Sequence, residues 1–160
     1  MEGPIQARRA AIAAEVRKDG VHEREAAGWR VLVVDDDEPF AVALADALAS
    51  DPGFEVVGVA HGVASGFEAA RVGVDVVLVD YRMPGGGGVA LTRRIVESFP
   101  GLAVVAMSGS WDRSSRAAIT TAGAVATIDK TAPVDDVCTV VRDACGRVAR
   151  PGLDDRSDQP

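Results

Sequence analysis

Residues 75–88 read DVVLVDYRMPGGGG, and this stretch decides the fold. A run of four apolar residues at 76–79 ends in Asp80, and Pro84 and four glycines follow. A short apolar run that is rich in β-branched residues and does not alternate is typical of a strand buried on both faces. We therefore predict a buried strand that ends at Asp80. The glycines allow a tight turn and a close approach of the backbone just beyond this carboxylate.

Four similar apolar runs occur elsewhere in the chain, and stretches with helical spacing of apolar residues separate them. The runs are VLVV at 31–34, VVGVA at 56–60, LAVVAM at 102–107 and VATI at 125–128. Strands that alternate with helices over short connections indicate a parallel sheet with helices on both faces. Five such units over residues 30–149 are too few for an eight-stranded barrel. We predict an α/β fold with an open, doubly wound five-stranded sheet, for which the strand order 2-1-3-4-5 is usual.

The last predicted helix has the clearest apolar stripe, which runs from Val134 to Val148 and includes both cysteines. Cys138 and Cys145 lie seven residues apart in it, roughly 10 Å along a helix, which is too far for a disulfide. We interpret both cysteines as core packing. Gly146 lies near the expected end of this helix, as a stop signal would.

Composition limits the domain organisation and the class of function. We predict one domain over 29–150, a partly helical extension over 1–28 and a disordered acidic tail over 151–160. The net charge of −7 argues against a nucleic-acid surface, since phosphate binding relies on clustered basic residues. We see neither a signal peptide nor an apolar run long enough for a membrane span. We therefore expect a soluble, cytoplasmic protein.

Polar side chains follow four of the predicted strands at their carboxyl ends. The first strand is followed by the acids 35–38, the third by Asp80, the fourth by Ser108 and the fifth by Lys130. Ligands of open α/β sheets bind at this edge, where the strand order reverses. Neighbouring carboxylates repel one another, and Mg²⁺ relieves such repulsion while keeping room for waters and phosphate oxygens. The pattern indicates phosphoryl transfer, with Asp80 as nucleophile, Lys130 as counter-charge and Ser108 as hydrogen-bond donor.

One of the acids 35–38 is also expected to cap the helix that follows. Of these four acids we therefore assign only Asp35 and Asp36 to the metal, and we expect Asp80 to be a ligand as well. Trp111, in the loop after the fourth strand, could face a partner near the site or pack against the next helix; both interpretations stay open here.

Taken together, these segments resemble the receiver domain of two-component response regulators. The resemblance covers about residues 30–149 and rests on VLVVDDDEP, DVVLVDYRMPGGGG, VVAMSGS and ATIDKTAP, which occur in the family's order at the expected strand ends. It implies a flavodoxin-like fold similar to that of chemotaxis regulators. It also implies that phosphate comes from a histidine kinase or a phosphotransfer protein, and that the output is a changed face for a downstream protein or a second copy.

The resemblance assigns a role to each site residue. Asp80 would be the phosphoacceptor, and Asp36 would bind Mg²⁺ directly. Asp35 would act on the metal through water, and the main-chain carbonyl of Arg82 would complete the protein's ligands. Ser108 and Lys130 would contact the phosphoryl group. Such a protein is no enzyme beyond its own phosphorylation and dephosphorylation, and no contact with nucleic acid or membrane is expected within this chain.

Three features depart from the family pattern. Thr131 follows the lysine where many receivers have proline, Thr127 occupies a position that is often aromatic, and four glycines follow Pro84. One alternative is therefore an interaction module that works without phosphorylation. A less favoured alternative is a phosphohydrolase similar to haloacid dehalogenases, with Asp35 as nucleophile and Asp37 as general acid, although Pro39 does not fit its pattern.

Overall fold

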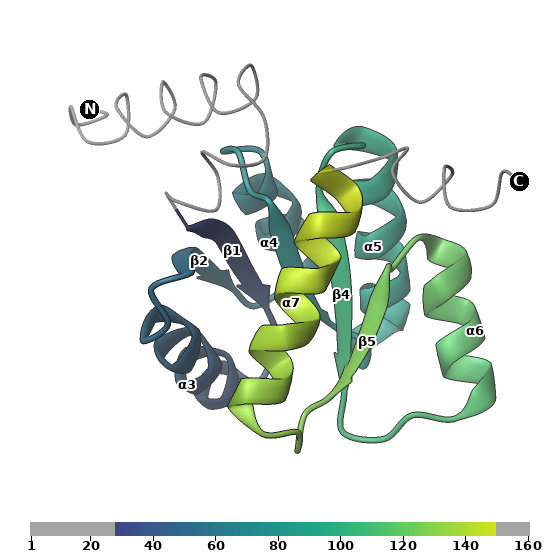
Figure 1. The fold of residues 1–160 in the computed structure, drawn as a ribbon. Helices are drawn as coiled ribbons and strands as arrows, with labels where there is room; N and C mark the ends of the chain where they lie inside the picture. The colour runs from purple at the N-terminus through teal and green to yellow at the C-terminus, as the bar shows by residue number, and fades with distance from the viewer. Residues whose placement is uncertain (1–27, 150–160) are drawn as a thin grey trace, which may run out of the picture.

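The computed structural model describes residues 28–149, in which five strands alternate with five α-helices (Figure 1). The strands are β1 (Trp29–Val34), β2 (Phe54–Ala60), β3 (Val76–Asp80), β4 (Ala103–Ser108) and β5 (Ala126–Asp129). The helices are α3 (Glu38–Ala49), α4 (Val63–Ala70), α5 (Gly87–Ser98), α6 (Arg113–Ala122) and α7 (Val134–Ala149), and a 3-10 turn, η1 (Pro84–Gly86), precedes α5. All five apolar runs of the sequence therefore form strands, as predicted.

The strands form one parallel sheet in the order β2-β1-β3-β4-β5, which confirms the predicted topology. The order reverses between β1 and β3, where Val34 pairs with Val79. The residues that follow these two strands therefore lie side by side. All strands run toward the bottom of Figure 1, so their carboxyl ends share one edge of the sheet.

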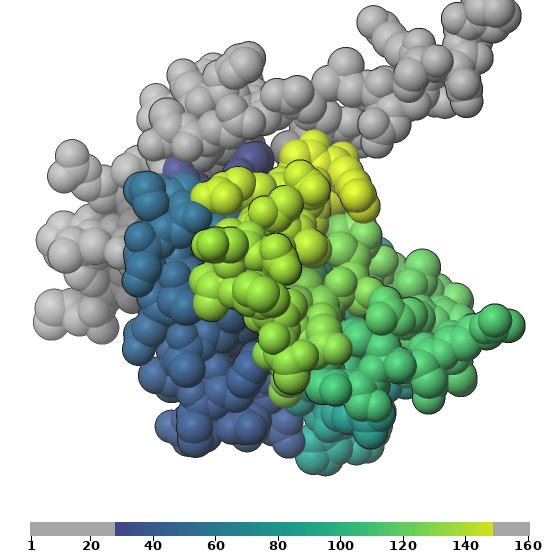
Figure 2. Space-filling model, turned by 60° about the horizontal axis from the view of Figure 1, so that its bottom comes forward, coloured from purple at the N-terminus to yellow at the C-terminus, as the bar shows by residue number. Residues whose placement is uncertain are grey.

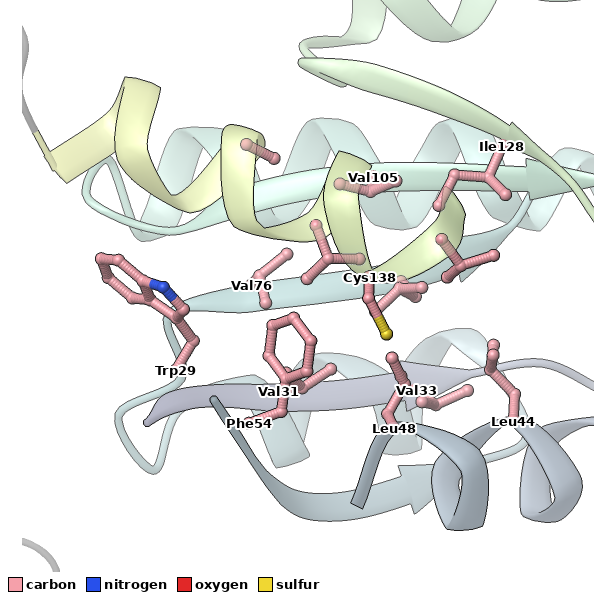
Figure 3. Packing of buried hydrophobic residues seen from close by; sticks show 14 of the residues in the cluster. Trp29, Val31, Val33, Leu44, Leu48, Phe54, Val76, Val105, Ile128 and Cys138 are labelled. Carbon is pink, nitrogen blue, oxygen red and sulfur yellow. The ribbon is translucent and has the colours of Figure 1, made fainter. Parts of the chain in front are cut away.

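One face of the sheet packs against α3 and α7. Inward side chains of all five strands meet Leu44 and Leu48 of α3 and Cys138 and Val141 of α7 in one apolar cluster. Figure 3 shows this packing, with Trp29 and Phe54 at one end of the cluster and Ile128 at the other. The cluster is almost entirely aliphatic, as the low aromatic content of 4% requires.

The other face packs against α4, α5 and α6. Its cluster joins alternate residues of the strands, such as Leu32, Val77 and Val104, to Leu91 and Ile95 of α5. The central strands are thus covered on both sides, which explains why their apolar runs do not alternate. The sheet is therefore packed on both faces, and its carboxyl edge is the part that carries the polar side chains.

The ends of the helices agree only in part with the sequence. Asp37 caps α3, since its side chain accepts a hydrogen bond from the N–H of Phe40, as expected for one of the acids 35–38. Gly146 lies near the end of the last helix, as expected, but it does not stop the helix at once, because α7 continues to Ala149. Glycine weakens a helix but does not break it, and the apolar stripe on both sides of Gly146 keeps α7 packed on the sheet.

The described residues also bear on two other expectations, whereas a third lies outside them. Cys138 and Cys145 are both buried and form no disulfide, as predicted. None of the helices within residues 28–149 is long and apolar enough to cross a membrane. The expected extension over 1–28 and the acidic tail over 151–160 lie outside the described residues, apart from Gly28.

Candidate phosphoryl-transfer site

Three carboxylates meet where β1 and β3 end. One oxygen from each of Asp35, Asp36 and Asp80 lies within 4.8 Å of the others. Asp35 and Asp80 are buried and Asp36 is exposed, so the cluster opens to solvent on one side. The parallel pairing of β1 with β3 brings together residues that are about 45 positions apart in the chain.

Main-chain groups orient both buried carboxylates. Asp35 Oδ1 accepts a hydrogen bond of 2.9 Å from the N–H of Asp37, and Asp80 Oδ1 accepts one of 3.1 Å from the N–H of Arg82. In each case the chain turns just after the strand and donates back to the last acid. Each carboxylate is therefore fixed by the turn that follows its own strand, before any ligand is present.

Lys130 brings a positive charge to the same place from the end of β5. Its Nζ lies 2.7 Å from Asp35 Oδ2 and 3.4 Å from Asp80 Oδ1. The Nζ also lies 4.6 Å from the centre of the Phe40 ring, a distance at which a cation is attracted to an aromatic face. The shorter contact shows that Lys130 pairs first with Asp35 and only second with Asp80.

These charges shift the acidity of the two partners. The pKa of Asp80 is raised to about 6, mainly because the carboxyl group is buried. Asp36 and Asp35 add to this increase, whereas the N–H of Arg82 and the charge of Lys130 oppose it. For Lys130, burial lowers the pKa, but Asp35 and Asp80 more than offset this effect and raise it above its usual value. The cluster therefore holds more negative charge than one lysine neutralises.

The donor set suits a hard divalent cation. Mg²⁺ is usually held by one or two carboxylates together with waters and phosphate oxygens. Asp35, Asp36 and Asp80 each offer a carboxylate oxygen, and these oxygens lie within 4.8 Å of one another, close enough to share one ion. Burial is the main cause of the raised pKa of Asp80, and Asp36 and Asp35 raise it further; a bound cation would offset the effect of these two acids. The main-chain carbonyl of Arg82 as a further ligand stays a prediction.

Ser108 reaches the same edge at the end of β4, but its hydroxyl faces its own loop. Asp80 pairs with Met107 in the sheet, so Ser108 lies one residue beyond. Ser108 Oγ donates to the carbonyl of Ser110 at 3.0 Å and accepts from the N–H of Ser110 at 3.2 Å. The sequence predicted the position of this hydroxyl but not its partner.

Trp111 is half-buried and packs against neighbouring side chains, which favours the second of the two interpretations that the sequence left open. Its ring lies 5.2 Å from that of Tyr81, the residue after Asp80, and the indole Nε1 donates to the carbonyl of Ile128 at 2.9 Å. The guanidinium of Arg116 on α6 lies 5.5 Å from the Trp111 ring. Sequence reasoning missed the role of Tyr81 and Arg116; an aromatic residue directly after the site aspartate was the one available signal.

The glycines after Pro84 serve two distinct purposes. Gly85 and Gly86 both have φ of +70°, a conformation that favours glycine, and they form the turn before α5. Gly88 allows close packing, because a Cβ there would lie 2.5 Å from the main-chain oxygen of Asp80. The predicted close approach is thus present, and it holds the start of α5 against the end of β3.

Thr131 shapes the turn after Lys130. Its N–H and its hydroxyl both donate to Asp129 Oδ1, at 2.8 and 2.7 Å. A proline at this position could make neither bond. Side-chain hydrogen bonds therefore fix the residues around Lys130 in this chain.

The fold and the site together define a class of protein. Residues 31–142 match the family model described as the response regulator receiver domain, which is well over half of the chain. The chain therefore belongs to the response regulator receiver family, in agreement with the resemblance of its strand-end segments. The haloacid dehalogenase alternative loses its support, and in the structure Asp37, its general acid, caps α3.

Curated relatives include regulators and enzymes that carry more than this domain. The response regulator GacA of Pseudomonas viridiflava is 34% identical over 114 residues, which is 71% of this chain and 53% of that protein. A protein-glutamate methylesterase/protein-glutamine glutaminase of Geobacter metallireducens is 43% identical over 84 residues, 52% of this chain and 24% of that protein. The chain spans about half, or less, of the length of the curated relatives that it matches.

Solved structures of receivers superpose on most of the described residues. The signal receiver domain of the response regulator NarL from Mycobacterium tuberculosis has a TM-score of 0.69 at 27% identity, covering 74% of this chain and 97% of that one. A response regulator from Thermotoga maritima has a TM-score of 0.66 at 30% identity, covering 74% and 98%. A CheY-like receiver from Methanospirillum hungatei, at 22% identity and a TM-score of 0.69, shares the fold over 76% of this chain and 96% of that one.

Proposed function

We propose that this chain is a phosphorylatable signalling switch whose phosphoacceptor is Asp80. The phosphoryl group would come from a phosphohistidine of a histidine kinase or a phosphotransfer protein. The observation that carries the proposal is the position of the Asp80 carboxylate, 3.4 Å from Lys130 Nζ and within 4.8 Å of oxygens of Asp35 and Asp36. Family membership supports the same role.

The chemistry needs positioning and charge neutralisation more than covalent help. A carboxylate oxygen of Asp80 attacks phosphorus, a P–O bond forms, and the P–N bond to the donor histidine breaks with its electron pair staying on nitrogen. Because its pKa is about 6, Asp80 is mostly ionised at pH 7 and can act as the nucleophile. Lys130 then pairs with a phosphoryl oxygen, and the Ser108 hydroxyl donates to another.

Asp35, Asp36, Asp80 and the main-chain carbonyl of Arg82 would hold Mg²⁺. When bound, the ion supplies positive charge to the phosphoryl oxygens and relieves the repulsion among the three acids. Asp36 would bind it directly, as its exposure at the open side of the cluster permits, and Asp35 would act through water.

A groove beside the site suits the approach of a donor protein. It lies between α3 and α7, next to Lys130, and apolar side chains such as Phe40, Ala47 and Val137 line it. Figure 2 shows α3, in blue, beside the yellow-green α7. A donor helix seated there would bring its phosphohistidine to the carboxyl edge of the sheet. The protein would act in the cytoplasm, where such donors are phosphorylated.

The output would be a changed surface for a downstream protein or for a second copy of the chain. A phosphoryl group adds negative charge to the acidic cluster, and a bias on the order of a few kcal/mol suffices to shift a two-state equilibrium. The methylesterase activity named for some relatives is not proposed here, because the chain covers only 24% of the Geobacter protein. The chain's own chemistry would be limited to its phosphorylation and dephosphorylation.

The test is phosphorylation by a small donor. The full chain is incubated with acetyl phosphate and Mg²⁺, and its intact mass is measured beside those of Asp80→Asn and Asp46→Asn. Asp46 lies exposed on α3 and gives a matched removal of one carboxylate outside the site. We expect one added phosphoryl group in the wild type and in Asp46→Asn, and none in Asp80→Asn. No addition in the wild type, or equal addition in Asp80→Asn, would contradict the proposal.

A further inference from the structure

Lys130 contacts the ring of Phe40 in addition to its two carboxylate partners. Phe40 lies in the first turn of α3, and the Lys130 Nζ lies 4.6 Å from the centre of its ring. The same ammonium lies 2.7 Å from Asp35 Oδ2 and 3.4 Å from Asp80 Oδ1. A cation at such a distance is attracted to the negative face of an aromatic ring. The lysine that follows β5 is therefore held between an aromatic ring and two acids.

The turn that orients Asp35 also sets the position of the Phe40 ring. The N–H of Asp37 donates to Asp35 Oδ1 at 2.9 Å, and the N–H of Phe40 donates to Asp37 Oδ1 at 3.2 Å. The ring is half-buried and packs against the apolar cluster between the sheet and the helices α3 and α7. These contacts form a closed loop with the ion pair between Asp35 and Lys130, so the start of α3 brings the ring to the lysine.

The ring matters most when the carboxylates have another partner. A lysine side chain is long and flexible, and holding it in one place costs conformational entropy. Asp35 and Asp80 hold it in the structure described here, but both are also proposed ligands of Mg²⁺. With a divalent cation on these oxygens, the acids attract the ammonium less, and the two cations repel each other. The attraction of the Phe40 ring for the ammonium does not depend on those oxygens.

We propose that Phe40 is a positioning residue, which keeps the Lys130 ammonium at the phosphoryl site when Asp35 and Asp80 serve the metal. The inference rests on the proposed function, because it concerns the lysine that pairs with a phosphoryl oxygen on Asp80. The ring acts through Lys130 rather than on the reacting atoms. Without the ring, the acids and the lysine remain, but the ammonium spreads over more positions, and phosphoryl transfer becomes slower.

The first test observes the contact through the lysine itself. The chain has two lysines, Lys18 and Lys130, so ¹³C-labelled lysine gives two sets of side-chain signals, which Lys18→Arg assigns. Spectra of the full chain are recorded with EDTA and with Mg²⁺. Protons above the face of an aromatic ring resonate upfield. We therefore expect the Cε protons of Lys130 to lie upfield of those of free lysine under both conditions.

Two substitutions at Phe40 complete this test. Phe40→Leu keeps an apolar side chain on the cluster but removes the ring, whereas Phe40→Tyr keeps a ring. We expect the upfield shift of Lys130 to vanish in Phe40→Leu and to persist in Phe40→Tyr. A wild type that lacks the shift, or that loses it when Mg²⁺ is added, would overturn the inference. This measurement needs no phosphorylation, so its failure leaves the proposed function intact.

The second test measures phosphorylation by acetyl phosphate at saturating Mg²⁺, followed by intact mass. We expect Phe40→Leu to react roughly two- to fivefold more slowly than the wild type, the factor that one cation–π contact supplies, and Phe40→Tyr to recover most of the rate. Phe67→Leu is the matched control. Phe67 is a half-buried ring on α4 that packs on Phe99, and the Arg94 guanidinium lies 4.1 Å from its centre. This variant loses a contact of the same kind outside the site and should keep the wild-type rate.

The outcomes separate the inference from the proposed function. No gain in mass in the wild type would overturn both. A wild type that gains the phosphoryl group while Phe40→Leu reacts at an equal rate would overturn the inference alone. A slower reaction that Phe67→Leu shares, or that Phe40→Tyr does not relieve, would also overturn it, because Phe40 would then act through stability or packing. Melting temperatures are measured beside the rates, and the rates are taken well below the lowest of them.

Discussion

The site consists of two halves that are held in different ways. The charged half joins Asp35, Asp80 and Lys130 by direct contacts of 2.7 and 3.4 Å between groups that β1, β3 and β5 carry. The hydroxyl half joins Ser108, Ser110 and Trp111 by hydrogen bonds of about the same length within the loop after β4 and from that loop to β5. Strand pairing fixes the first half, whereas loop conformation fixes the second.

This difference separates the chemistry from the switch. The charged half is already assembled, so a phosphoryl group or a cation finds its partners in place, and preorganisation of this kind favours transfer. In the hydroxyl half, Ser108 donates to the carbonyl of Ser110, and this hydrogen bond must break before Ser108 can donate to a phosphoryl oxygen. We therefore expect changes in the charged half to alter phosphorylation and stability strongly, and changes in the hydroxyl half to alter mainly the response.

The largest effect on stability is expected for Lys130→Met. Removing Lys130 leaves the buried carboxylates of Asp35 and Asp80 without their counter-charge, a loss of about 3 kcal/mol or more in the free energy of unfolding without Mg²⁺. Mg²⁺ should reduce this difference in stability between the wild type and Lys130→Met, because it supplies positive charge to the same oxygens. Denaturant unfolding with EDTA and with Mg²⁺ measures both values.

The control for Lys130→Met is Arg142→Met, which breaks a partly exposed ion pair with Asp51 at the end of α3 away from the site. Exposed pairs contribute about 1 kcal/mol or less, and Mg²⁺ should not change this loss. If Mg²⁺ left the stability loss of Lys130→Met unchanged, Lys130 would not neutralise the same carboxylates as the metal.

The next effect is a pH dependence that comes from Asp80. Its pKa is about 6 in the folded chain, against about 3.9 in an unfolded one, so the folded state binds more protons between these values. The stabilising contribution of Asp80 to the free energy of unfolding is therefore fully present below about pH 4 and is lost as the pH rises through 6. With EDTA present, Asp80→Asn should therefore gain up to about 3 kcal/mol over the wild type between pH 4 and 7.

Denaturant unfolding at several pH values measures this difference. Asp46→Asn, on the exposed side of α3, should show a difference that barely changes with pH. A constant difference for Asp80→Asn, or one that shrinks as the pH rises, would contradict the raised pKa of Asp80.

A smaller effect is expected where α5 meets the charged half. Gly88→Ala would place a Cβ 2.5 Å from the main-chain oxygen of Asp80, and the backbone must shift. We expect a loss of about 1–3 kcal/mol in the free energy of unfolding, together with slower phosphorylation. Gly101→Ala is the control, since a Cβ there meets nothing within 4 Å. Equal stability of the two variants would show that the approach of α5 to β3 is not tight.

The smallest effect on stability is expected in the hydroxyl half. Arg116→Ala removes an exposed contact with the Trp111 ring and one hydrogen bond to Thr127, so it should cost about 1 kcal/mol or less. Arg113→Ala, on the first turn of the same helix, is the matched control. A loss above about 2 kcal/mol would mean that Arg116 supports the fold and would remove the contrast between the two halves.

The same contrast explains what the sequence could predict. The apolar run before Asp80 and the four similar runs indicated the strands, and a parallel sheet brings their carboxyl ends to one edge. The positions of Asp35, Asp80 and Lys130 follow from that topology alone. The cap at Asp37 was likewise predictable, because an acid before an apolar helical stretch is a common start signal.

Loop contacts and one helix end were not predictable in this way. The bond from Ser108 to Ser110 and the anchor of Trp111 on Ile128 depend on the conformation of a few loop residues, which no apolar spacing encodes. Gly146 failed as a stop signal because packing of α7 outweighed the local preference of one residue. Tertiary contacts decide such cases.

The most direct test of the central claim is to locate the phosphoryl group. After incubation with acetyl phosphate and Mg²⁺, borohydride reduces an aspartyl phosphate to homoserine, and peptide mass spectrometry identifies the modified residue. We predict modification at Asp80 alone, lost when EDTA removes the metal. Modification at Asp35 or at an exposed acid, or labelling that is unchanged by EDTA, would contradict the assignment of one magnesium-dependent site at the ends of β1, β3 and β5.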